Sequence, residues 1–254
     1  MKIAVISDCH LDMRRDGGWE RIYKVCKAAD RAKILVIAGD LCEVDESLNM
    51  DNLGLYGKAV HKWSQHFEHI IAVAGNHEYY NTSMGVVDRY MLRLQERFPA
   101  FKSLDLCEYL EIEGRRFVGG TLWFKEPDIR GKLLSIRMND FRMIGDFEPS
   151  VYARAEAAKK RIEKYAGKNS IVVTHHAPSM RSARENYLGE PLTPLFYVND
   201  CTEIICRQEP SVWVHGHMHT PVDYVHPASS TRVLSNPLGY PYQTGGRPGK
   251  VFEV

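Results

Sequence analysis

Five short segments of the chain carry residue types that bind metal ions. In chain order they are Asp8-Cys9-His10, Gly39-Asp40, Gly75-Asn76-His77-Glu78, His175-His176 and Gly216-His217-Met218-His219. Asp and Asn offer oxygen ligands and His offers nitrogen, a mixed set that suits divalent transition metals. Two such ions about 3.5–4 Å apart can clamp the oxygens of a phosphoryl group during in-line attack. The segments therefore predict a two-metal centre with phosphoester chemistry.

Each segment follows an apolar run that is typical of a buried β-strand. The runs are Lys2–Ser7, Lys33–Ala38, His69–Ala74, Ser170–Thr174 and Val212–Val214. Open α/β sheets place their sites at the carboxyl ends of strands, so we expect the five segments to meet at one edge.

Spacing within the segments gives each side chain a direction. Asp8 and His10 are two residues apart, as are His217 and His219, so in extended backbone each pair would face one side. Asp40 has two carboxylate oxygens and could bridge two ions. Asn76 adds a carbonyl oxygen and His175 a further nitrogen.

As a set, the five segments resemble the calcineurin-like metallophosphoesterase superfamily, and the similarity runs from Met1 to about His219. The runs Met138–Arg142 and Asn236–Tyr240 are similar to runs in a bacterial and phage branch with a single domain. The resemblance implies an α/β fold, a four-layer αββα sandwich of two mixed β-sheets flanked by helices.

The resemblance also implies roles for individual residues. One ion would be held by Asp8, His10, Asp40 and His219. The other would be held by Asp40, Asn76, His175 and His217. His175 is preferred to His176 because Pro178 follows it by three residues, a spacing in which family members use the first histidine. After a metal-bound hydroxide attacks phosphorus, His77 would protonate the leaving oxygen, so His77 and the bridging Asp40 are the predicted catalytic residues.

The expected cofactors are two divalent or trivalent metal ions. Manganese is the first choice, while iron, zinc, nickel and cobalt also suit a mixed nitrogen and oxygen site. The expected substrate is a phosphorylated small molecule or nucleotide. A phosphodiester is favoured because an acid such as His77 helps most when the leaving group is poor.

Three further residues are candidates for substrate contact: His176, Arg137 and Arg142. Both arginines lie in residues 121–148, a long stretch without clear periodicity, and such stretches are often functional. A guanidinium can bind a phosphate, although a solvated charged surface is the alternative interpretation. Loop 180–199, with Arg184 and Tyr187, is a second candidate wall of the site.

The remaining patterns predict how the chain alternates between helices and strands. Helical spacing is found in residues 18–32, 56–66, 86–98, 151–165 and 201–207. Further strands are expected at residues 109–112 and 116–119, which form a hairpin, and at 222–226, 231–234 and 251–254. Residues 41–54 are polar and irregular, as expected of a loop over the site. The pattern predicts a βαβα half followed by a strand-rich half with a second sheet.

Composition places limits on the class of protein. The 254 residues, 44% of them hydrophobic, favour one domain spanning 1–254. A formal net charge of +1 gives no field that attracts nucleic acid or membranes.

The cysteines and the lengths of the apolar runs indicate the compartment. Six scattered cysteines without a CxxC motif indicate reduced thiols in the cytoplasm. No apolar run approaches the ~18 residues of a membrane span, and we expect no signal peptide. Oligomeric state is not encoded in any pattern that we can read.

Three alternative functions fit parts of this pattern. A nuclease acting on DNA or RNA would need a basic groove, and little chain remains after Gly216 to form a capping domain. A catalytically silent scaffold would have lost ligands, whereas all of them are present. A protein serine/threonine phosphatase would be expected to have an arginine directly before the Gly-Asn-His-Glu motif. In this chain Ala74 occupies that position, before Gly75.

Overall fold

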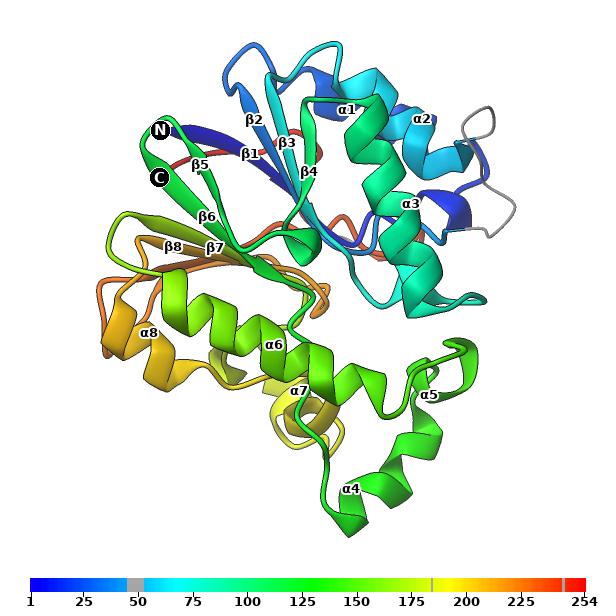
Figure 1. The fold of residues 1–254 in the computed structure, drawn as a ribbon, viewed down its shortest axis with the longest axis vertical. Helices are drawn as coiled ribbons and strands as arrows, with labels where there is room; N and C mark the ends of the chain where they lie inside the picture. The colour runs from blue at the N-terminus through cyan, green and yellow to red at the C-terminus, as the bar shows by residue number, and fades with distance from the viewer. Residues whose placement is uncertain (45–52, 184, 244) are drawn as a thin grey trace.

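The structure, a computed structural model, describes residues 1–44, 53–183, 185–243 and 245–254. Residues 45–52 of the predicted polar loop and Arg184 of the second candidate wall lie outside this part. Two β-sheets pack face to face, and helices cover their outer faces (Figure 1). The predicted four-layer αββα sandwich is confirmed.

The first sheet has the strand order β11-β1-β2-β3-β4. Its strands are β1 (Lys2–Ile6), β2 (Ile34–Ala38), β3 (His69–Val73), β4 (Phe101–Ser103) and β11 (Val251–Glu253). All neighbours are parallel except β11, which pairs antiparallel with β1. The outer face is covered by α1 (Trp19–Cys26), α2 (Gly54–Trp63) and α3 (Met84–Arg97) (Figure 1).

The second sheet has the order β5-β6-β7-β8-β10-β9. Its strands are β5 (Leu110–Ile112), β6 (Arg115–Gly120), β7 (Ser170–Thr174), β8 (Val212–His215), β9 (Val222–Val225) and β10 (Arg232–Ser235). The two edge strands, β5 and β9, pair antiparallel with their neighbours and the inner pairs are parallel. Its outer face is covered by α6 (Ser150–Tyr165) and α8 (Thr202–Gln208) (Figure 1).

Side-chain alternation along the buried strands produces the layers. In β1, Ala4 and Ile6 pack toward the helices, whereas Ile3 and Val5 pack between the sheets. In β8, Trp213 faces the helices while Val212 and Val214 face the other sheet. Because both faces of these strands are buried, they read as continuous apolar runs rather than alternating ones.

The sequence did not predict several short elements. Strand β4 has three residues, too few to show a period of two. The stretch 121–148 contains α4 (Ile129–Leu134), a 3₁₀ turn (Ser135–Arg137) and α5 (Asp140–Met143). The loop 180–199 contains a 3₁₀ turn (Met180–Ser182), α7 (Glu185–Leu188) and a π turn (Thr193–Tyr197). Each is shorter than two helical turns, so no repeat appears in the sequence.

Two predicted helices end earlier than their apolar spacing indicated. Helix α1 ends at Cys26 rather than at residue 32, and α2 ends at Trp63 rather than at residue 66. In both cases the following residues form tight turns, with bonds such as Ala28 N–H to Val25 O and His66 N–H to Trp63 O. Within the described ranges, no helix combines the length and apolar character needed to cross a bilayer.

Candidate metal centre

The predicted ligands converge where five central strands end. Asp8 and Asp40 each follow their strand, β1 or β2, by two residues, and Asn76 follows β3 by three. From the second sheet, His175 directly follows β7, and His217 and His219 follow β8. The shared edge of both sheets therefore brings together residues that are up to 211 positions apart in the chain, from Asp8 to His219.

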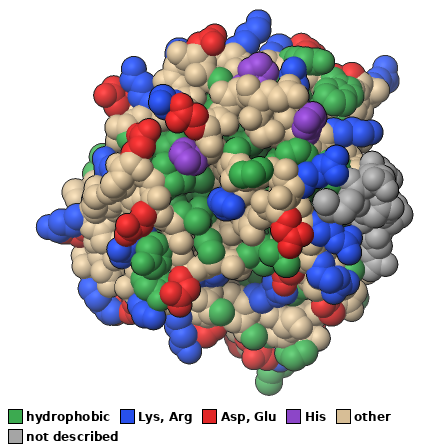
Figure 2. Space-filling model, turned by 45° about the horizontal axis from the view of Figure 1, so that its top comes forward, with side chains coloured by type: hydrophobic (Ala, Val, Ile, Leu, Met, Phe, Trp, Pro, Cys, Tyr) green, Lys and Arg blue, Asp and Glu red, His purple; other side chains and the backbone are tan. Residues whose placement is uncertain are grey.

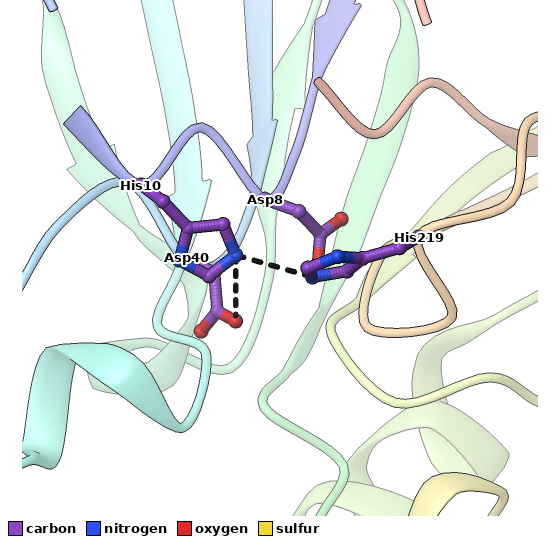
Figure 3. A group of neighbouring side chains, drawn as sticks. All are labelled: Asp8, His10, Asp40 and His219. Carbon is purple, nitrogen blue, oxygen red and sulfur yellow. Dashed lines mark hydrogen bonds and ion pairs between the residues drawn. The ribbon is translucent and has the colours of Figure 1, made fainter. Parts of the chain in front are cut away.

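The first group consists of Asp8, His10, Asp40 and His219, each of which offers one atom within 4.8 Å of the others. Figure 3 shows these side chains facing one another. His10 Nε2 lies 3.1 Å from His219 Nε2 and 3.8 Å from Asp40 Oδ2. His219 Nε2 also lies 3.3 Å from Asp8 Oδ1. Two carboxylates and two imidazoles in this arrangement are a suitable ligand set for a transition-metal ion.

The second group consists of Asp40, His175 and His217, with Asn76 beside them. His175 Nε2 is the central atom, at 3.0 Å from Asn76 Oδ1, 3.1 Å from His217 Nδ1 and 3.4 Å from Asp40 Oδ1. Asp40 thus faces the first group with Oδ2 and the second with Oδ1. This is the position of a carboxylate that bridges two ions.

Hydrogen bonds around the second group show which atoms carry lone pairs. His175 Nδ1 donates to the carbonyl of Ala38 at 2.9 Å, so neutral His175 presents its Nε2 lone pair to the group. Asn76 Nδ2 donates to the Tyr80 hydroxyl at 2.8 Å and to Asp140 Oδ1 at 3.1 Å, which leaves Oδ1 facing His175. Acceptor atoms therefore face one another, and a cation between them resolves that repulsion. The donor set fits a bound metal ion.

Burial and nearby charges shift the pKa values of the ligands in different directions. Burial lowers the pKa of His10 to about 3, so this ring is neutral near pH 7. Burial alone would raise the pKa of Asp40, but His175 and His77 outweigh it and hold that pKa well below its ordinary value. Burial likewise opposes protonation of His175, yet the Asp40 carboxylate raises its pKa to about 10. The second group thus attracts positive charge, which a proton or a metal ion can supply.

Five predicted ligands adopt left-handed backbone conformations. The φ angles are 49° at Asp8, 42° at His10, 55° at Asp40, 65° at His217 and 47° at His219. The prediction that each Asp-x-His or His-x-His pair converges through extended backbone is therefore wrong, although the side chains do meet. Such conformations cost roughly 1–3 kcal/mol each and cluster at functional sites. The sharp turns also let His217 join one group while His219 joins the other.

Close backbone approach and one buried carboxylate hold these turns together. A Cβ at Gly39 would overlap the His175 ring, and one at Gly75 would overlap the Asp40 carboxylate. Buried Glu78 accepts hydrogen bonds from the backbone N–H groups of Asp40, Leu41 and Gly75, at 2.9, 2.7 and 2.7 Å. Glu78 thereby ties the loop after β2 to the loop after β3.

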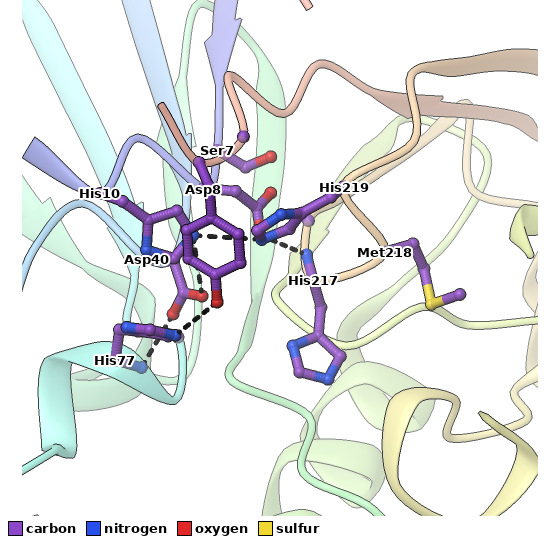
Figure 4. Close-up of polar contacts among 12 residues, drawn as sticks. Ser7, Asp8, His10, Asp40, His77, His217, Met218 and His219 are labelled. Carbon is purple, nitrogen blue, oxygen red and sulfur yellow. Dashed lines mark hydrogen bonds and ion pairs between the residues drawn. The ribbon is translucent and has the colours of Figure 1, made fainter. Parts of the chain in front are cut away.

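His77 lies beside both groups without belonging to either. Its backbone N–H donates to Asp40 Oδ1 at 2.9 Å, as Figure 4 shows, and its ring lines the cavity above the centre. Its Nε2 lies 3.2 Å from the hydroxyl of Tyr240. The ring therefore lines the cavity, with the Tyr240 hydroxyl as a polar neighbour.

A cavity of about 240 Å³ opens over the centre. Besides the ligands Asp40, Asn76, His217 and His219, its walls include His77, Tyr80, Arg137, Met138, Tyr187, Tyr197, Tyr240 and Gln243. The guanidinium of Arg137 is at the rim, 3.4 Å from a carboxylate oxygen of Glu190. The two candidate walls predicted from residues 121–148 and 180–199 therefore both reach the cavity.

The other two candidates for substrate contact are not among the residues that line this cavity. Arg142 is exposed and donates to the side chain of Asn139 at 2.5 Å. His176 is fully buried, with its ring centroid 4.2 Å from that of His217 and its Nδ1 donating to Thr121 O at 3.2 Å. Burial lowers the pKa of His176 to about 3. Its place is behind a ligand rather than beside a substrate.

Several residues of the site had no assigned role from the sequence. Glu78 is one. Asp140 and Tyr80 form a second set, since the Tyr80 hydroxyl donates to Asp140 Oδ1 at 2.7 Å and both accept from Asn76. Tyr240 and Gln243 are the third set. Asp140 and Tyr240 lie in the two runs that resemble a branch of the superfamily, which is the only signal that pointed to them.

Comparison with known proteins agrees with this geometry. The model of the calcineurin-like phosphoesterase family matches residues 1–221. The chain belongs to that family. It is 26% identical over 208 residues to the uncharacterized protein L509 of Acanthamoeba polyphaga mimivirus, covering 73% of each chain. Its fold is similar to that of the phosphopantetheinyl hydrolase PptH from Mycobacterium tuberculosis, with a TM-score of 0.71 and 16% identity over 97% of this chain and 95% of that one. Family membership and the buried Asp and His cluster together support metal-dependent phosphoester hydrolysis.

Proposed function

We propose that the protein is a dinuclear metal-dependent phosphoesterase whose substrate is a phosphodiester or a nucleotide-type phosphoester. One observation carries the proposal: the two oxygens of Asp40 face two separate groups of converging acceptor atoms, at 3.8 Å from His10 Nε2 and 3.4 Å from His175 Nε2. A shared carboxylate between two ligand sets is the arrangement that two-metal hydrolases require. Manganese is the metal to test first.

In this proposal each residue has a defined task. Asp8, His10 and His219 hold one ion, Asn76, His175 and His217 hold the other, and Asp40 bridges them. Bound ions would supply a nucleophilic water of lowered pKa and neutralise charge on the phosphoryl oxygens. His77 then gives a proton to the leaving oxygen, and the cavity wall with Arg137 and the tyrosines orients the rest of the substrate.

The preference for a diester or nucleotide rests on the walls of the cavity. Tyr187 and Tyr197 line the cavity near the centre, and Tyr187 is 41% exposed. Aromatic rings can stack on a base or another flat group, while Arg137 can meet a second charged group.

The charge distribution does not favour a nuclease. Figure 2 shows Lys and Arg side chains interspersed with Asp and Glu over the drawn face, and the formal net charge is +1. Nucleic-acid binding usually depends on a basic patch or groove that tracks the phosphates.

The test is hydrolysis of paired aryl phosphate monoesters and diesters by metal-stripped protein titrated with Mn²⁺. We expect turnover to rise with occupancy of two sites per chain, as counted by calorimetry, and to be greater for diesters. Two bound ions without turnover of either ester would overturn the preference for simple diesters. Absence of both metal binding and turnover would overturn the enzyme assignment.

Asp40→Asn provides the matching variant. Replacing one bridging oxygen with an amide nitrogen removes a ligand from one group and a negative charge from both. We expect fewer than two ions per chain and loss of turnover. Asp30→Asn, at an exposed position, is the control and should behave as wild type. An Asp40→Asn protein that binds two ions and turns over normally would contradict the bridging role.

A further inference from the structure

The segment Asn236–Gln243 reaches into the metal centre, although it lies outside residues 1–221 that the family model matches. The ring of Tyr240 has its centroid 4.3 Å from that of His10 and 4.6 Å from that of His219. Its hydroxyl lies 3.2 Å from His77 Nε2. Gln243 Oε1 lies 2.6 Å from His219 Nδ1. The segment therefore contacts two predicted ligands and the predicted acid.

The fold fixes this segment in place. The Arg21 guanidinium donates to the carbonyls of Leu238 and Gly239 at 2.8 and 3.1 Å. Arg14 donates to the Gly239 carbonyl at 2.5 Å. The Leu238 N–H donates to Ser7 O, the residue directly before Asp8, at 2.8 Å. These bonds tie the segment to the turn that carries Asp8 and to the start of α1, so Tyr240 and Gln243 are held close to the ligands.

The hydrogen bonds of Gln243 determine which nitrogen of His219 carries a proton. The backbone N–H of Tyr240, which can only donate, lies 2.9 Å from Gln243 Oε1, so the side-chain atom at that point is the amide oxygen. The same oxygen lies 2.6 Å from His219 Nδ1, which must therefore donate. Neutral His219 then presents its Nε2 lone pair to the first ligand group. A metal-binding histidine typically has such a partner on its other nitrogen.

We propose that residues 236–243 are a functional part of the metal centre: Gln243 is a positioning residue that fixes the metal-binding tautomer of His219, and Tyr240 is a positioning residue that orients the His77 ring. This inference rests on the proposed function and adds two positioning residues to the proposed metal centre. For Tyr240, the phenol ring packs on His10 and His219 while the hydroxyl contacts Nε2 of His77, so one side chain couples the acid to the first metal site.

For Gln243, the test is Mn²⁺ affinity measured by titration calorimetry. Gln243→Leu removes the acceptor, and we expect binding at one of the two sites to weaken by about 10- to 100-fold. Gln243→Glu keeps an oxygen facing Nδ1 and should restore the affinity. Gln65→Leu is the control, because Gln65 is not among the residues of the site. Its side chain lies 3.3 Å from that of the exposed His61. Far-ultraviolet circular dichroism checks that each variant is folded.

For Tyr240, the readout is the dependence of kcat on the leaving group. Tyr240→Phe keeps the ring contacts, so both ions should bind as in wild type. Loss of the hydroxyl should lower kcat more for an alkyl ester than for an aryl ester and change KM little, because an aryl leaving group needs less help from an acid. Tyr23→Phe is the control, since Tyr23 lies in α1, outside this segment, and is 56% exposed.

The outcomes separate this proposal from the function on which it rests. Wild-type protein that binds no metal would overturn both. Wild-type protein that binds two ions, with Gln243→Leu binding them equally tightly, would overturn the role of Gln243 alone. Equal loss of affinity in Gln243→Glu and Gln243→Leu would show that packing, not the acceptor oxygen, matters at this position. An unchanged leaving-group dependence in Tyr240→Phe would overturn the role of Tyr240.

Discussion

His77 contacts the metal centre through its backbone, and this separates its role from that of the ligands. The N–H group holds Asp40 Oδ1 at 2.9 Å, while the ring lies at the cavity wall. Any residue other than proline can supply the backbone bond. The contribution of the ring can therefore be removed without disturbing the bridging carboxylate.

This leads to a prediction for His77→Ala. Both ions should still bind, because the alanine retains the backbone N–H that donates to Asp40. Hydrolysis of an alkyl ester should slow by about 100- to 10,000-fold, the usual contribution of a general acid, and that of a good aryl leaving group should slow much less. The measurement is kcat for a series of esters with leaving groups of different pKa.

The control for His77→Ala is His66→Ala, an exposed position outside the five segments. Equal rates for His77→Ala and wild type on the alkyl ester would show that another group delivers the proton.

At this scale the sequence predicts residue types well and their partners poorly. The ligands could be predicted because Asp, Asn and His recur at the ends of apolar runs. Gln243 could not, because it supports His219 from 24 residues further along the chain and a lone glutamine has no distinctive spacing. The left-handed conformations at Asp8 and Asp40 could not be predicted either, since the surrounding structure imposes them against the local preference of the residues.

At the scale of elements, the loops after β2 and β3 form one unit. Glu78 connects them by accepting three backbone hydrogen bonds while fully buried. Burial is the main cause that raises the pKa of Glu78, to about 8, and the nearby Asp40 carboxylate is the second cause. The cost of burying this carboxyl is offset by the donors that surround it.

Glu78→Leu should therefore destabilise the protein strongly. Three buried N–H groups would lose their acceptor, and each unsatisfied group costs about 1–3 kcal/mol, so the free energy of unfolding should fall by at least about 3 kcal/mol. Glu78→Gln keeps one oxygen and should lose less. Urea denaturation followed by circular dichroism measures both. An unchanged midpoint for Glu78→Leu would mean that water replaces the carboxylate.

Most strands were predictable from the sequence, even the three-residue strands β5 and β11, whereas the shortest helices were not. Five-residue strands such as β2 and β7 could be recognised from the sequence because every residue in them is apolar or small, and all of them are buried. The helices of the stretch 121–148, α4 and α5, have six and four residues, and the position of α5 depends on tertiary contacts such as the bond between Asn76 and Asp140. Local sequence carries little of that information.

For the whole molecule, the centre connects the two sheets. Their facing surfaces pack through apolar residues such as Val5, Val36 and Val173. Beyond this core, the first sheet contributes Asp8, Asp40 and Asn76, and the second contributes His175, His217 and His219. Bound ions would link the two sheets across the edge at which five left-handed ligand residues store strain.

Removal of metal should therefore lower the thermal stability of the whole molecule. Each ion at about 100 times its Kd would add about 2.7 kcal/mol to the folded state, so two independent ions would add about 5.4 kcal/mol. For a chain of this size that corresponds to a rise in Tm of roughly 10–20 °C. Scanning calorimetry with Mn²⁺ and with a chelator measures the difference, and Asp40→Asn should show a smaller one. If Mn²⁺ binds with two ions per chain but leaves Tm unchanged, the unfolded chain must bind the ions as well as the folded one does, and the ions would not hold the sheets together.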